Sequence, residues 1–112
     1  MSNITNLVHI VIFFPLFYYV YVSRDSLSNE VKYLLLLLAA MGILFHLYKV
    51  VSVDKMKWIY LIHLIIVFPI LLYIGYGDKT PRYIFELLLI VAFGMLGYHS
   101  YNLVYYGILN KN

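Results

Sequence analysis

Four long apolar stretches make up most of this chain. They run over residues 4–22, 31–51, 57–76 and 83–106, and each is close to the roughly 20 residues that an α-helix needs to cross a membrane. Of the 112 residues, 64% are hydrophobic and 12% are charged, whereas a soluble domain is about 45–50% apolar and about a quarter charged. The sequence therefore predicts an all-α, multi-pass integral membrane protein that forms one domain over residues 1–112 and has the lipid bilayer as its main partner.

The connections between these stretches are short, so consecutive helices are expected to be antiparallel neighbours in a bundle, with both termini on one side. Lysine and arginine counts normally set the orientation in the membrane, but here they are equal. The side with the termini carries Lys49, Lys55, Lys57 and Lys111, and the other side carries Arg24, Lys32, Lys79 and Arg82. The sequence therefore predicts no preferred orientation, and a net charge of +3 at helix ends does not indicate nucleic-acid binding.

The second half of the chain matches the first half. A shift of 54 places the first stretch on the third, and a shift of 53 places the second on the fourth; the matches that stand out are His9 with His63, Phe14-Pro15 with Phe68-Pro69, and His46-Leu47-Tyr48 with His99-Ser100-Tyr101. We interpret the chain as a duplicated two-helix unit, with copies over 1–53 and 54–112. Two helices per copy make a parallel repeat around an axis along the membrane normal, with the first and third helices diagonal. Each helical proline removes a hydrogen bond and is expected to kink its helix.

Each apolar stretch contains one histidine, and these are His9, His46, His63 and His99. Antiparallel packing brings all four to one level, roughly 8–10 Å inside one edge of the apolar layer at 1.5 Å per residue. An ionisable side chain inside a membrane is costly and indicates a functional site. His46 and His99 share helix faces with small or polar residues, which favours an inward direction, whereas the faces of His9 and His63 are bulky.

The histidines predict a cluster that binds haem b or a transition metal. Neutral imidazole is a good ligand for zinc, copper, nickel and iron, and axial imidazoles can hold a haem between helices. Helices 1 and 3 would supply one imidazole pair, and helices 2 and 4 the other. Lys49 and Asn102 lie one turn nearer the membrane surface than His46 and His99 and could meet haem propionates, while Gly42 would give the haem ring room.

Proton or cation movement through the same bundle is the alternative, because histidine can shuttle protons near neutral pH. The string Ile74-Gly75-Tyr76-Gly77-Asp78 resembles the potassium-channel selectivity filter, whose pattern is Thr-Val-Gly-Tyr-Gly-Asp. This resemblance implies ion coordination by backbone carbonyls, although Tyr73 stands where the filter has threonine. Glu86 is the main carboxyl group in the apolar stretches and lies about 20 Å along its helix from His99, so it would belong to an oligomer contact or a separate path.

A structural role is the third interpretation. The histidines would then form hydrogen bonds between helices, and the protein would assemble with copies of itself or with other membrane proteins. Enzymatic chemistry is not predicted, because the sequence has no nucleophile elbow, no paired carboxylates and no phosphate-binding glycine loop. The absence of cysteine excludes disulfides and thiolate metal sites.

Overall fold

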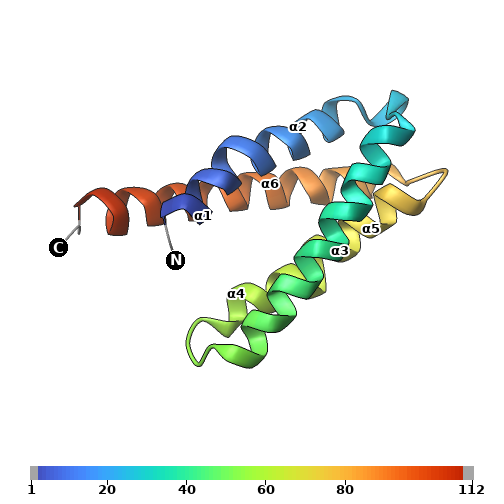
Figure 1. The fold of residues 1–112 in the computed structure, drawn as a ribbon. Helices are drawn as coiled ribbons and strands as arrows, with labels where there is room; N and C mark the ends of the chain where they lie inside the picture. The colour runs from blue at the N-terminus through green and yellow to red at the C-terminus, as the bar shows by residue number, and fades with distance from the viewer. Residues whose placement is uncertain (1–2, 110–112) are drawn as a thin grey trace. The chain divides into compact units, whose positions relative to one another are not determined.

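A computed structural model describes residues 3–109, which are almost entirely helical and contain no strand. Figure 1 shows how the helical elements follow one another along the chain. In chain order they are α1 (Asn3–Val8), η1 (His9–Phe13), α2 (Phe14–Val22), η2 (Arg24–Ser26), α3 (Asn29–Ser52), α4 (Lys57–Ile62), η3 (His63–Val67), α5 (Phe68–Tyr76), α6 (Arg82–Asn102) and η4 (Leu103–Leu109).

Four helices are long and apolar enough to cross a membrane. They span Asn3–Val22, Asn29–Ser52, Lys57–Tyr76 and Arg82–Ile108. Each boundary lies within two residues of the boundary expected from the apolar stretches. The prediction of an all-α chain with four helices of transmembrane length is therefore confirmed.

Local sequence explains where these helices begin and end. Ser28 caps α3, because its hydroxyl oxygen accepts a hydrogen bond of 3.3 Å from the amide of Val31, and this contact satisfies one of the donors that a helix start leaves unpaired. Gly77 has an extended backbone and follows the last residue of α5. Pro81 precedes α6, where its missing N–H costs no helical hydrogen bond.

The two helical prolines follow π-helical turns. Pro15 and Pro69 are the second residues of α2 and α5, which directly follow η1 and η3. In each case the preceding phenylalanine amide, of Phe14 or of Phe68, donates to the carbonyl of a histidine five residues earlier. A proline inside an α-helix lacks its donor and its ring collides with the carbonyl four residues before it. The wider π turn takes up this mismatch at the place where a kink was expected.

The chain divides into two compact units. Arg24 and the described residues before it form the terminal unit with those from Glu86 onward, and Asp25–Phe85 form the central unit. In the central unit α3 packs antiparallel to the helix made of α4, η3 and α5 (Figure 1). Its buried residues include Leu35, Ala39, Leu71 and Ile74. In the terminal unit α1 packs on η4, and the buried residues include Phe17, Val20, Leu88 and Ala92.

Candidate functional site

The terminal unit holds one pair of stacked histidines. The rings of His9 and His99 have centroids 4.0 Å apart and planes 23° from parallel. His99 is 3% exposed, and beside it lies Asn6, a polar residue that is only 1% exposed. Nδ1 of His99 donates to Oδ1 of Asn6 over 2.8 Å, and Nδ1 of His9 donates to the carbonyl of Thr5 over 2.7 Å.

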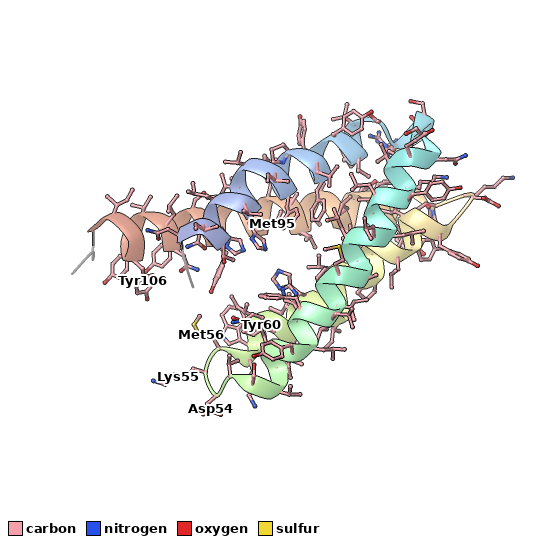
Figure 2. The ribbon with its side chains drawn as sticks, in the orientation of Figure 1. Asp54, Lys55, Met56, Tyr60, Met95 and Tyr106 are labelled. Atoms are coloured by element: carbon pink, nitrogen blue, oxygen red, sulfur yellow. The ribbon has the colours of Figure 1, made fainter. Side chains whose placement is uncertain are left out.

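The central unit holds the second pair. The rings of His46 and His63 have centroids 4.4 Å apart and planes 22° from parallel. Nδ1 of His46 donates to the carbonyl of Gly42, and Nδ1 of His63 donates to the carbonyl of Ile59, both over 2.7 Å. The Tyr60 ring, on the α4 side of this unit in Figure 2, meets His46 edge-on at 5.7 Å.

All four histidines therefore have one tautomer. A carbonyl oxygen can only accept a hydrogen bond, so Nδ1 of each ring must carry the proton. In a neutral imidazole the lone pair then belongs to Nε2. A histidine that ligates a metal commonly has this arrangement, with its second nitrogen held by a carbonyl oxygen or a carboxylate.

The pairing differs from the expected one. We expected one imidazole pair from helices 1 and 3 and another from helices 2 and 4, whereas the stacks join helix 1 with helix 4 and helix 2 with helix 3. The reason is proximity, since α3 and α4 are joined by the short segment 53–56 and lie side by side. His9 and His63, whose direction the sequence left open, both face the histidine of their partner helix.

The residues expected to support a haem have other surroundings. Nζ of Lys49 lies 5.5 Å from the centroid of the Phe45 ring, and Asn102 is buried. Beside Gly42 the Phe68 ring already fills the space that was expected for haem, since a Cβ added to Gly42 would collide with it. Gly42 therefore serves the contact between α3 and α5 in this structure.

Sequence reasoning missed Asn6. It is the residue that fixes the ring of His99 across the helix pair, although it lies in the first apolar stretch beside His9. Two signals pointed to it: a polar amide within an apolar stretch, and a position three residues before a histidine on a helix, where side chains share a face. The shift of 54 places Asn6 on Tyr60, which also contacts a histidine.

Each unit presents two imidazoles and no larger ligand set. Among residues 3–109, no three or more His, Cys, Asp or Glu side chains lie together in a way that could hold a metal ion. The lone pair of Nε2 lies in the ring plane, so two nearly parallel rings do not point at one ion at the usual bond length of about 2 Å. Ligation by a pair therefore requires at least one ring to rotate.

The filter-like string lies at the end of a helix. Ile74, Gly75 and Tyr76 belong to α5, and the amide of Gly77 donates to the carbonyl of Tyr73 over 3.0 Å. Potassium filters instead use loops whose carbonyls form rings around the ion. Asp78 and Glu86 are both exposed, and Glu86 lies in α6 thirteen residues before His99.

Comparison of the chain with protein-family models, with curated proteins and with solved structures finds no match. The two histidine pairs are the features of the described chain that bring several ionisable side chains together among apolar helices.

Proposed function

We propose that this chain is an integral membrane protein whose four helices cross the bilayer, and that each stacked histidine pair binds a transition-metal ion. The observation that carries the proposal is the shared tautomer of His9, His46, His63 and His99, each with Nδ1 held by an oxygen acceptor. Imidazoles fixed in this way already have the tautomer that ligation through Nε2 needs.

The proposal includes the duplication of a helix pair. The shift that relates His9 to His63 also relates the π turn of η1 to that of η3, and each turn is followed by a Phe-Pro pair. Under the matching shift for the other helices, His99 corresponds to His46. Each stack then contains one histidine from each copy, so two equivalent metal sites are expected per chain.

The geometry favours a metal ion over haem b. Two imidazoles on opposite faces of one haem iron have their ligating nitrogens about 4 Å apart, because each bond from metal to nitrogen is about 2 Å long. Each ring centre lies roughly 1 Å behind its nitrogen, so the two ring centres are about 6 Å apart. The observed centroid distances are 4.0 and 4.4 Å, and the gap beside Gly42 is filled by Phe68. A haem would have to force the helices apart, whereas a metal ion requires one ring of a pair to give up its Nδ1 hydrogen bond and rotate, while the other ring keeps its own.

The class of metal follows from the ligand atoms. Imidazole nitrogen suits zinc, copper, nickel and iron, while the residues that the structure describes form no carboxylate-rich site of the kind preferred by magnesium and calcium. Two protein ligands leave positions open for water or another small ligand. The proposed sites would therefore bind metal less tightly than a closed structural site with four ligands.

The test is elemental analysis of the full chain purified in detergent, after loading with zinc or copper and removal of unbound metal. We expect about two ions per chain, falling to about one in His46→Ala or His99→Ala and to none in the double variant. Leu47→Ala is the matched control, because Leu47 is an exposed neighbour of His46. If the wild-type chain retains no metal after loading, the proposed metal sites are refuted. A haem absorption band would show that the bound group is haem and not a metal ion.

A structural role is the second candidate, and the hydrogen bond between Asn6 and His99 favours it. This contact joins two helices in a buried position, where such bonds contribute about 0.6 to 2 kcal/mol. If the histidine variants bind as much metal as the wild type but unfold more easily, the pairs serve helix packing alone. Proton or cation flux in liposomes that disappears in both histidine variants would instead support transport.

A further inference from the structure

A small hollow opens at the other end of the central unit from the histidines. It has a volume of about 250 Å³ and lies between the first turns of α3 and the end of α5, and its lining residues include Lys32, Tyr33, Tyr76, Gly77 and Asp78. On α3 the lining residue nearest to His46 is Leu36, ten residues before it, which corresponds to about 15 Å along the helix. The hollow is therefore separate from the proposed metal site.

Gly75 permits the helix contact that forms the floor of the hollow. A Cβ at this position would lie 2.9 Å from the carbonyl oxygen of Lys32 and 2.8 Å from Cγ of Leu36. Both distances are shorter than ordinary van der Waals contact. Only glycine lets α5 approach α3 this closely, so the hollow depends on the backbone and does not arise from loosely packed side chains.

The lining carries one positive and one negative side chain. Nζ of Lys32 donates to the carbonyl oxygen of Gly77 over 3.3 Å, which places the ammonium group at the edge of the hollow. An ammonium group has three N–H donors, so two remain for a ligand. Asp78 directly follows Gly77 and also lines the hollow. The site therefore offers a donor for an anion and, nearby, a carboxylate for a cation.

The level of the hollow on the helices indicates its surroundings. It lies at the start of the candidate span Asn29–Ser52 and at the end of the candidate span Lys57–Tyr76. If these helices cross a membrane, this level is the depth of the lipid headgroups. Tyr33 and Tyr76 border it with 66% and 85% of their surface exposed. Tyrosine is enriched at this boundary because its ring is apolar and its hydroxyl is polar.

We infer that this hollow binds the headgroup of a zwitterionic phospholipid, with the phosphate on Lys32 and the ammonium group on Asp78. A headgroup with both charges satisfies both side chains, whereas an anionic lipid would bring its charge near the Asp78 carboxylate without a compensating partner. This inference rests on the membrane insertion proposed above, and it is independent of metal binding.

The test uses the full chain in dodecyl maltoside and native mass spectrometry with three probes: dihexanoyl-phosphatidylethanolamine, dihexanoyl-phosphatidylglycerol and inorganic phosphate. We expect the ethanolamine lipid to bind about tenfold more tightly than the glycerol lipid, in line with one charge-assisted hydrogen bond. Lys32→Gln should weaken the binding of both lipids about tenfold. Asp78→Asn should weaken the binding of the ethanolamine lipid only, and so remove the preference for it over the glycerol lipid.

Lys79→Gln is the matched control, because Lys79 is an exposed cation in the connection between α5 and α6. We expect this substitution to leave lipid binding unchanged. Equal binding of the two lipids overturns the inference, and so does an equal effect of Lys79→Gln and Lys32→Gln. Inorganic phosphate that binds as tightly as the ethanolamine lipid would indicate a site for free anions and would also overturn it. If Lys32→Gln fails to fold, the loss of preference in Asp78→Asn still decides the question.

Alkaline carbonate extraction of membranes separates the two proposals. A chain that is released by carbonate is not inserted, and the proposed function and the headgroup site then fail together. A chain that stays in the membrane pellet but shows no lipid preference overturns the headgroup site alone.

Discussion

The imidazole of His46, from α3, stacks on the imidazole of His63, at the start of η3, with 4.4 Å between ring centroids. Each ring is also tied to its own helix, because its Nδ1 donates to the carbonyl four residues earlier. The position of each ring is thus set by the backbone of its helix. The stack is therefore sensitive to the register and rotation of the two helices.

Asn6→Ala should destabilise the terminal unit. The substitution removes the oxygen that accepts the hydrogen bond from Nδ1 of His99, a ring that is 3% exposed. A buried donor that loses its acceptor costs about 1–3 kcal/mol. Hydrogen bonds between helices in membranes contribute about 0.6 to 2 kcal/mol, so the cost should fall in the lower part of the first range. We expect a loss of about 1–2 kcal/mol in the free energy of unfolding, measured by titration with dodecyl sulfate in mixed micelles.

The control for this variant is Ile4→Ala on the same helix, where the side chain is 74% exposed and little packing is lost. If Asn6→Ala and Ile4→Ala unfold at the same detergent fraction, the bond between Asn6 and His99 does not stabilise the protein.

Gly42→Ala should destabilise the protein, whereas Gly94→Ala should not. A Cβ at Gly42 would collide with the buried Phe68 ring, whereas a Cβ at Gly94 would meet no atom of the described residues within 4 Å. Overpacking costs about 1–3 kcal/mol, while alanine in a helix is about 1 kcal/mol more favourable than glycine. We expect a lower thermal midpoint for Gly42→Ala and an unchanged or higher one for Gly94→Ala, measured by circular dichroism in the same detergent.

The fold followed from the sequence more closely than the site did. Helix boundaries could be predicted because long apolar stretches are separated by charged and turn-forming residues such as Ser28, Gly77 and Pro81. The presence of one histidine per helix was also visible. Which rings would stack could not be derived, because periodicity gives the face of a helix but not its neighbour, and two diagonal helices have the same pattern as two adjacent ones.

Two further features of the fold could not be predicted from the sequence. The π turns in front of Pro15 and Pro69 have no sequence pattern that separates them from a proline kink, since both relieve the same missing donor and steric collision. The Phe68 ring beside Gly42 reversed the expected role of that glycine. A small residue indicates close approach, but only the structure identifies what approaches.

Metal loading should stabilise the chain, and removal of the metal should reverse the effect. A ligand that binds only the folded state at a concentration 100 times its dissociation constant adds about 2.7 kcal/mol. We expect zinc or copper to raise the thermal midpoint of the wild type and a chelator to lower it again. His63→Ala should reduce the shift, because it removes one ring of the central pair, while a shift of unchanged size in the His9→Ala and His63→Ala double variant would show that the metal acts elsewhere.

Pro69→Ala should move His63 away from His46 without unfolding the helix. With an amide at position 69, a hydrogen bond to the carbonyl of Ile65 becomes available, and the reason for the wide turn over His63–Val67 disappears. A π turn holds one more residue than an α turn. Its conversion to an α turn therefore rotates the helix before it by about 100° relative to the helix after it. The buried face of α5, with Leu71 and Ile74, holds the following part in place, so the rotation falls on His63.

The chain has no cysteine, so a pair of introduced cysteines reports only on its own two positions. We expect a short bismaleimide to cross-link His46→Cys with His63→Cys readily with Pro69 present, because the two native rings are in contact, and much more slowly with Pro69→Ala. Pro81→Ala is the control, because Pro81 lies outside the helices and should leave the rate unchanged. Equal rates in all three backgrounds would mean that the π turn persists without its proline, and that the residues of η3 themselves favour the wide turn.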